Sequence, residues 1–257
     1  WKKGDTGRTS HGGGKTGLWY LLTFAIGTIV GSFLNVVIYR STKEDLKLWD
    51  PPHSFCPNCK RKIEWYDNIP VISYILLRGK CRHCGWRIPI RYPIVEISTG
   101  ALFLVNRVLI KDTLLFVSSC VIASALIAIS LIDLETFLIP DYLNFTVLIF
   151  SFVVALRTSF LEHLISFLIV TIMFLILKAM YRDGLGAGDV ILAMGIGFLL
   201  PPVPSIFAIL IASISGILYA LIKGKGKMDI KTRIPFGPFL ALGGYTLFLI
   251  SYGMGWL

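Results

Sequence analysis

Four of the five cysteines form two Cys-x-x-Cys pairs in one segment of the chain. Cys56 and Cys59 make the first pair, Cys81 and Cys84 make the second, and 21 residues separate the pairs. A tight Cys-x-x-Cys turn places two thiolates on one side of a loop. Two such turns that face each other supply four sulfur ligands in a tetrahedron, which suits zinc. The spacing therefore predicts a structural zinc site, and a pair of redox-active dithiols is the alternative.

Two aspartates lie where apolar runs meet polar loops, far from the cysteines in sequence. Asp133 directly follows the apolar run 113–132, and Asp189 follows a Gly-Ala-Gly turn at 186–188. A single aspartate at such a place is usually a helix cap. Two of them on the same side of a membrane can instead share a proton, activate a water as base and protonate a leaving amine as acid. Helix caps and a catalytic pair are the two interpretations that the residues allow.

The chain that must position these side chains is too apolar for a soluble domain. Of its 257 residues, 55% are hydrophobic and only 16% are charged, whereas soluble domains carry about 25% charged residues. The mean hydropathy is +0.73, which also excludes a disordered chain. A helix needs about 20 mainly apolar residues to cross a bilayer. Eight stretches meet or approach this length: 18–39, 93–110, 113–132, 142–156, 163–177, 190–200, 205–222 and 234–257. We therefore expect an all-α polytopic membrane protein with about eight transmembrane helices.

The positions of Lys and Arg explain the net charge of +10 and predict an orientation. The segment 40–91 holds 11 Lys and Arg against 5 Asp and Glu, and the loop 223–233, expected on the same side, holds five more cations. The opposite loops offer only Arg107, Lys111 and Arg157. Cytoplasmic loops of membrane proteins carry such an excess. We therefore expect the cysteine segment and both aspartates to face the cytoplasm, both chain ends to lie outside, and no nucleic-acid partner.

These observations divide the chain into four parts. Residues 1–17 fit no expected element and are interpreted as an expression remnant or a disordered tail. Residues 18–39 form the first transmembrane helix, 40–92 a cytoplasmic zinc-binding domain, and 93–257 a membrane domain of about seven helices. A segment of about 50 residues can bury little apolar surface, so bound metal would have to supply folding free energy to the cytoplasmic domain.

Taken in order, the motifs resemble those of the bacterial prepilin peptidases, also called type IV prepilin leader peptidases. The resemblance covers nearly all of the chain after residue 17. It includes residues 31–40 (GSFLNVVIYR), both cysteine pairs, residues 67–73 (DNIPVIS), 77–81 (LRGKC) and 91–96 (RYPIVE), the segment from Asp133 to 139–141 (IPD), and the turn before Asp189. A Gly-x-Gly-Asp turn alone is weak support, whereas the ordered combination is specific.

The resemblance implies a membrane-embedded aspartic endopeptidase of the bacterial inner membrane. Such enzymes cut the short, basic leader from type IV pilin-like precursors at the cytoplasmic face of the bilayer, for pilus assembly or protein secretion. Matching the motifs assigns Asp133 and Asp189 as the catalytic pair. The match leaves Asp141 out, because archaeal relatives commonly have Asn at that position.

The resemblance also implies a second activity. Bacterial members with the cysteine-bearing loop methylate the new N-terminal amine, with S-adenosylmethionine as methyl donor. No Gly-rich Rossmann-type turn marks a site for this donor. The candidates are Gly31, Asn35, Arg78, Lys80 and Glu96. Their structural alternatives are helix packing for Gly31, an interhelical hydrogen bond for Asn35, and anchoring at the membrane surface for the two cations.

Two other classes of protein compete with this interpretation. A transporter would use membrane aspartates to bind ions or protons, although these aspartates lie at the ends of spans and the two halves of the chain show no internal repeat. A thiol oxidoreductase would use the cysteine pairs as dithiols, which the reducing cytoplasm disfavours.

Overall fold

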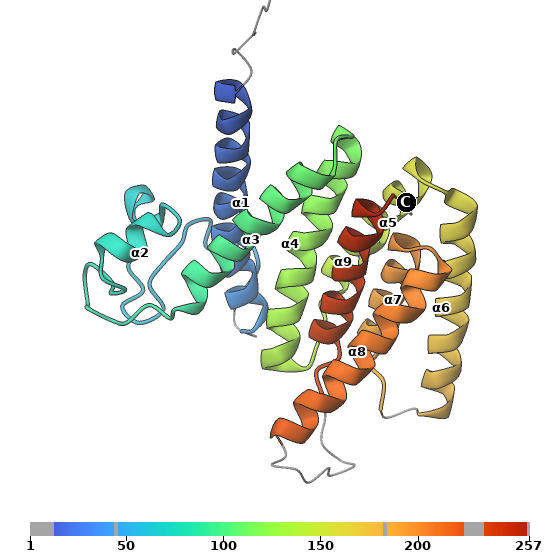
Figure 1. Ribbon diagram of the computed structural model, residues 1–257. Helices are drawn as coiled ribbons and strands as arrows, with labels where there is room; N and C mark the ends of the chain where they lie inside the picture. The colour runs from blue at the N-terminus through green and yellow to red at the C-terminus, as the bar shows by residue number, and fades with distance from the viewer. Residues whose placement is uncertain (1–12, 44–45, 182–183, 224–233, 256–257) are drawn as a thin grey trace, which may run out of the picture.

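The computed structural model describes residues 13–43, 46–181, 184–223 and 234–255. Within these ranges every regular element is a helix, and β-pairing is limited to three isolated bridges. The elements, drawn in Figure 1, are α1 (Gly13–Ser41), η1 (Trp65–Asn68), α2 (Ile72–Leu76), α3 (Arg91–Leu109), α4 (Thr113–Thr136), α5 (Asp141–Arg157), α6 (Phe160–Met180), α7 (Ala187–Leu199), α8 (Pro202–Lys223) and α9 (Gly237–Gly253).

A helix covers most of each of the eight apolar stretches in the sequence, from α1 and α3 to α9. Four helices are long and apolar enough to cross a bilayer: Gly17–Ser41 of α1, Thr113–Thr136, Phe160–Met180 and Pro202–Lys223. The prediction of an all-helical fold is thus confirmed for the described residues, and four helices meet the length and composition of a membrane span. The count of eight spans stays a prediction, because α7 has 13 residues, which rise about 20 Å against a bilayer core of about 30 Å.

The first helix begins earlier than expected. α1 starts at Gly13, so the helix includes residues 13–17 in addition to the expected 18–39. A helix that is nucleated in a long apolar run can extend into a neighbouring glycine-rich stretch, because each added residue gains one backbone hydrogen bond. The remaining residues of the expected tail, 1–12, lie outside the described residues.

Local signals set the ends of the helices that carry the two aspartates. Asp112 caps α4 by accepting a hydrogen bond from the Leu115 N–H at 2.9 Å. α4 ends at Phe137, whose backbone is left-handed (φ 56°), and Pro140 precedes α5. Pro201 lies between α7 and α8 and stops the apolar run from forming one continuous helix.

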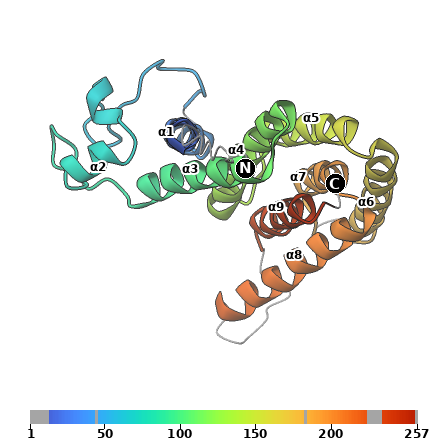
Figure 2. The ribbon, with the colours of Figure 1, turned by 45° about the horizontal axis from the view of Figure 1, so that its top comes forward.

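The helices form a bundle around α7 and α9. Figure 2 shows both helices enclosed by α4, α5, α6 and α8, with α1 and α3 on the far side of α4. Fully buried residues of α4, α7 and α9 meet in the core, among them Ile129, Ile196 and Phe248. Close helix approach depends on glycines: a Cβ on Gly31 would lie 2.7 Å from the Glu96 Cα of α3, so the α1–α3 crossing requires glycine there.

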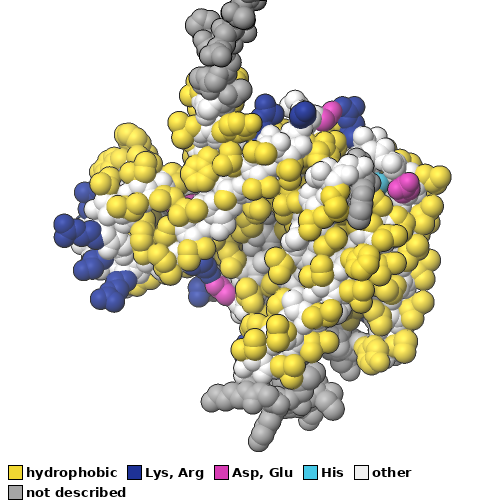
Figure 3. Space-filling view, viewed as in Figure 1, with side chains coloured by type: hydrophobic (Ala, Val, Ile, Leu, Met, Phe, Trp, Pro, Cys, Tyr) yellow, Lys and Arg dark blue, Asp and Glu magenta, His cyan; other side chains and the backbone are white. Residues whose placement is uncertain are grey.

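The outer surface of the bundle is apolar. Figure 3 shows hydrophobic side chains over most of the helices, with charged side chains at the ends of the bundle and on the segment between α1 and α3. Large aliphatic side chains such as Ile172 on α6 and Ile214 on α8 are more than half exposed. An exposed apolar surface of this extent marks contact with lipid rather than water.

Residues 42–90, described apart from 44–45, form a small module beside α1 and α3 (Figure 1). The buried Arg40 side chain at the end of α1 fixes its first loop. The guanidinium donates hydrogen bonds to the backbone carbonyls of Leu48, Pro51 and His53 at 2.7, 2.6 and 3.1 Å. The module therefore starts from a fixed position on α1. The end of the bundle where α1 ends and α3 begins is called the module end below.

Candidate functional site

The two cysteine pairs lie on two turns of the same construction. In the first turn the Cys56 N–H donates to the Arg61 carbonyl at 2.9 Å, and in the second the Cys81 N–H donates to the Trp86 carbonyl at 2.8 Å. The fourth residue after the leading cysteine is left-handed in both, Lys60 at φ 59° and Gly85 at φ 70°. Each turn thus directs its two sulfur atoms to one side, as the spacing predicted.

The two turns face each other and bring all four sulfur atoms together. The Sγ atoms of the predicted ligands lie within 4.8 Å of one another, and no other described His, Asp or Glu belongs to this group. Cys56 Sγ and Cys84 Sγ are 3.8 Å apart. Four thiol sulfurs around one point fit a tetrahedral metal site. Two independent dithiols would not need to converge.

The environment of the thiols differs across the group. Burial raises the pKa of the Cys56 thiol to about 11. The pKa of the exposed Cys84 falls to about 6, first because the Asn58 amide donates to its sulfur at 3.6 Å and then because of the Trp86 backbone N–H. A thiolate at Cys84 gives a cation its first ligand at neutral pH, and a coordinated dication favours loss of the remaining protons.

Asp133 lies in the last turn of α4 and is 3% exposed. Its Oδ2 accepts a hydrogen bond from the Gly237 N–H, at the start of α9, at 2.9 Å. A Cβ on Gly237 would lie 2.9 Å from this same oxygen, which is closer than a real Cβ can come. The first backbone N–H groups of a helix have no partner inside that helix, so α9 uses one of them to hold the Asp133 carboxylate.

Asp189 lies in the first turn of α7 and is half-buried. Its Oδ2 accepts a hydrogen bond from the Gly186 N–H at 3.2 Å, so the helix-cap alternative is realised in part. Ile139 approaches both Gly188, the residue before Asp189, and Gly237, whose N–H holds Asp133. The structure therefore places the segments that carry the two aspartates close together, although 56 positions separate the aspartates in sequence.

Two further side chains join the segments that carry the aspartates. The Asn144 amide of α5, fully buried, donates to the Gly188 carbonyl at 3.0 Å. Ile139 contacts the backbone on both sides, because a Cβ on Gly188 or on Gly237 would lie 2.9 or 3.2 Å from its side chain. Both glycines are thus required for the close approach of the two aspartate segments.

The sequence did not point to Asn144 or Gly237. Their contacts connect positions that are 44 and 104 residues apart, and neither residue type is unusual where it occurs. The available signal was the run Pro235-Phe236-Gly237-Pro238 ahead of the last apolar stretch, which is typical of a helix start. Asp141, which motif matching left out, is exposed at the start of α5.

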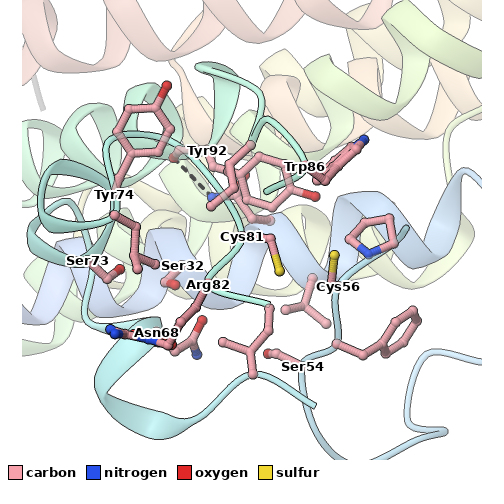
Figure 4. A pocket seen from close by; sticks show the side chains of 18 of the residues that line it. Ser32, Ser54, Cys56, Asn68, Ser73, Tyr74, Cys81, Arg82, Trp86 and Tyr92 are labelled. Atoms are coloured by element: carbon pink, nitrogen blue, oxygen red, sulfur yellow. Dashed lines mark hydrogen bonds and ion pairs between the residues drawn. The ribbon is translucent and has the colours of Figure 1, made fainter. Parts of the chain in front are cut away.

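A cavity of about 140 Å³ lies between the module, α1 and α3. Figure 4 shows Asn68, Ser73 and Tyr74 on one side of it and Cys56, Cys81 and Trp86 on the other. Arg82 also lines the cavity and makes a two-point ion pair with Asp67, with N···O distances of 2.6 and 2.8 Å. Arg82 holds the pKa of Asp67 below its usual range, so this carboxylate is ionised at neutral pH.

Two of the five candidates for the methyl-donor site line this cavity. Asn35 of α1 donates its amide N–H to the Tyr92 carbonyl at 3.1 Å, and its buried Oδ1 has no hydrogen-bond partner among the described residues. Glu96 of α3 is 7% exposed and accepts the Val71 N–H at 2.7 Å. Gly31 packs α1 on α3. Arg78 and Lys80 are exposed and do not line the cavity.

The cavity and the aspartate pair belong to the same end of the bundle. Arg91, at the start of α3, forms an ion pair with Glu135, two residues after Asp133. The Ser41 and Tyr142 hydroxyls, at the end of α1 and the start of α5, are 2.7 Å apart. Both candidate sites therefore lie at the module end.

The chain is similar to known proteins along most of its length. The family model of the bacterial Peptidase A24 N-terminal domain matches residues 25–110, and that of the type IV leader peptidase family matches residues 120–221. A prepilin leader peptidase/N-methyltransferase of Burkholderia pseudomallei is 31% identical over 91% of this chain and 86% of that protein. One of Dichelobacter nodosus is 32% identical over 94% of both chains.

A third relative carries a different name. The type 4 prepilin-like proteins leader peptide-processing enzyme of Escherichia coli is 33% identical over 87% of this chain and 91% of its own length. No solved structure matches the chain. These similarities confirm the resemblance in the sequence motifs: the chain belongs to the type IV leader peptidase family, together with the prepilin leader peptidase/N-methyltransferases.

Proposed function

We propose that this protein is an aspartic endopeptidase that removes the leader of type IV pilin-like precursors at the cytoplasmic face of a bacterial inner membrane. One observation supports the proposal: Ile139 approaches both Gly188, the residue before Asp189, and Gly237, whose N–H holds Asp133, so the segments that carry the two aspartates lie close together. The family and its relatives' names support the same activity. They do not support a transporter.

The two carboxylates act as a pair in this reaction. Neighbouring carboxylates cannot both ionise easily, so they share one proton. The ionised partner removes a proton from water as its oxygen attacks the scissile carbonyl carbon, and the protonated partner donates a hydrogen bond to the carbonyl oxygen. When the C–N bond breaks, the leaving amine takes up the proton. The Gly237 N–H fixes the orientation of the Asp133 carboxylate during these steps.

Asparagine substitutions test the pair, because Asn keeps the shape of Asp and cannot exchange a proton. We expect Asp133→Asn and Asp189→Asn each to lower the rate of precursor cleavage by about 10²-fold or more. Zinc content and thermal stability should stay near those of the unmodified protein. Asp141→Asn is the matched control and should keep substantial cleavage. Turnover is measured in detergent by mass spectrometry of the product, and near-normal cleavage by either of the first two variants excludes the pair.

The cavity beside the module is the proposed site of N-methylation of the new amine. S-adenosylmethionine, when bound, supplies the methyl group. The residues fit such a cationic, polar ligand. Asn35 Oδ1, which has no hydrogen-bond partner among the described residues, would accept a hydrogen bond from it, and the Glu96 carboxylate would offset its positive charge. Tyr74, Trp86 and Tyr92 would offer it aromatic faces. In the adjoining cysteine site we propose a structural zinc ion.

A pair of variants separates methylation from cleavage. We expect Glu96→Gln, and more severely a deletion of residues 44–88, to reduce the methylated fraction of the product while Asp133 and Asp189 still cleave the precursor. Arg78→Ala, at an exposed position outside the cavity, is the control and should methylate normally. Mass spectrometry of the product reports cleavage and methylation together. Normal methylation by the deletion would place the donor site among the other loops.

A further inference from the structure

The module exposes large apolar side chains on one side. Trp65, Ile75 and Leu76 are 78%, 67% and 75% exposed, and Ile69 and Ile72 next to them are also exposed. These five residues of η1, α2 and their connection are called the apolar face below. None of them lines the cavity or contributes to the cysteine site. A water-soluble domain of this size does not normally expose such a cluster.

Contacts with α3 fix the height of the apolar face along the bundle. The Val71 N–H, at the start of α2, donates to Glu96, which lies five residues after the first residue of α3 and thus about 7.5 Å along its axis. Ile94 and Ile97, at this same level of α3, are exposed to the surroundings of the bundle. α2 therefore lies at the same depth as the exposed apolar side chains of α3 and not beyond the end of that helix.

The distribution of hydrophobic and charged side chains on the module agrees with this placement. Figure 3 shows hydrophobic side chains of the module gathered on the side toward the N-terminal end of α1, and Lys and Arg along its outer and lower left edge. The exposed cations among the described residues of the module are Lys43, Lys47, Lys60, Arg61, Lys62, Arg78, Lys80, Arg82 and Arg87. An apolar side toward the bilayer core with cations behind it is the arrangement of a segment that lies in a membrane interface. Trp and Tyr side chains are enriched at membrane interfaces, and the module carries Trp65 and Tyr66 in η1.

We propose that the apolar face dips into the leaflet at the module end and that the cations behind it contact anionic lipid head groups. The module then contacts the membrane through its own side chains, in addition to being joined through the polypeptide to α1 and α3. The inference is independent of the proposed catalytic roles, because it rests only on the exposure, level and charge of the module.

Photo-cross-linking of the full chain tests the proposal. A benzophenone amino acid replaces Ile75, and in a matched control it replaces Arg61, in nanodiscs of phosphatidylethanolamine and phosphatidylglycerol. We expect an adduct to a lipid acyl chain on the peptide that contains position 75. The peptide that contains position 61 should carry no acyl-chain adduct, because the Arg61 position reaches no deeper than the lipid head groups. No adduct at position 75, in protein that retains its zinc, overturns the proposal. A cross-link from position 75 to a second copy also overturns it and makes the face an interface between copies.

Hydrogen exchange of the unmodified chain tests the proposal without any substitution, and so remains informative if the substituted chain fails to fold. We expect the backbone amides of 72–77 to exchange more slowly in nanodiscs with phosphatidylglycerol than in nanodiscs of phosphatidylcholine alone, because anionic lipid attracts the cations of the module. Equal exchange rates in the two lipids contradict the role of anionic head groups.

Discussion

Gly237 illustrates how a residue without a side chain controls the aspartate pair. A methyl group at this position would lie 2.9 Å from Asp133 Oδ2 and 3.2 Å from Ile139, so Gly237→Ala must displace the carboxylate or the start of α9. Displacements of about 1 Å can lower catalytic rates by about 10²-fold. We expect Gly237→Ala to reduce kcat for precursor cleavage by about this factor and to change KM much less, as steady-state kinetics would show.

Gly216→Ala is the matched control for this prediction. Gly216 also lies in a helix, but its added Cβ would be 3.4 Å from the nearest atom, in the Phe239 ring, which is an ordinary contact. It should fold and cleave like the unmodified chain. An unchanged kcat in Gly237→Ala would show that the Gly237 N–H does not position Asp133.

The residues that sequence reasoning found differ in kind from those it missed. The cysteines and aspartates carry their chemistry in their own side chains and at short, repeated or motif-like spacings. Asn144 and Gly237 act through single hydrogen bonds to distant segments. Among the methyl-donor candidates, Asn35 and Glu96 line the cavity while Arg78 and Lys80 do not, because a sequence does not reveal which way the side chains of the module turn.

Among the elements, the two cysteine turns depend most on a ligand. Little apolar surface is buried in the module, so loss of the metal should loosen residues 46–90 and leave α4 to α9 intact. We expect the double variant Cys56→Ser, Cys59→Ser to lose stoichiometric zinc and to show faster hydrogen exchange in the module. Cys120→Ser, in the core of α4, is the control and should keep its zinc. Retained zinc in the double variant would refute the four-cysteine site.

The start of α4 provides a prediction about pH. Asp112 lies outside the membrane span; the Leu115 N–H and then Arg157, whose ion pair with it measures 2.7 Å, lower the pKa of its carboxyl. A carboxyl with a lowered native pKa stabilises the fold above its unfolded pKa of about 3.9, and this contribution disappears as the pH falls through the native value.

Asp112→Asn should therefore lower the melting temperature at pH 7. The difference from the unmodified chain should shrink and vanish at acidic pH below the native pKa. Thermal unfolding in detergent across this range measures it. A difference that does not change with pH would show that the charge of Asp112 contributes nothing.

The elements that the sequence predicted are those with long apolar runs. Every such run became a helix, and proline and left-handed residues marked the ends of several. η1 and α2 were not predicted. They have four and five residues, too few for a periodic pattern, and a long-range hydrogen bond to Glu96 fixes the start of α2.

Across the whole molecule, the alternation of helices places the module and the aspartates at one end, and the excess of Lys and Arg predicts that this end faces the cytoplasm. We expect a protease to cut the module in inverted membrane vesicles but not in intact spheroplasts. The turn at Lys111, at the other end of the bundle, should show the opposite pattern. Cleavage of the module from outside the cell would reverse the orientation.

The positions of the two aspartates do not depend on an unbroken polypeptide chain. α5 and α9 each pack against both α4 and α7, so side-chain packing rather than a short loop sets the separation of Asp133 and Asp189. The turn at 158–159 lies at the end of the bundle opposite to both. If the chain were divided at this turn, the helix-packing contacts between the two fragments would remain. Fragments 1–158 and 159–257, expressed together, should therefore reassemble and cleave the precursor. The active site would then belong to a heterodimer, and a gene split at this point would still encode it.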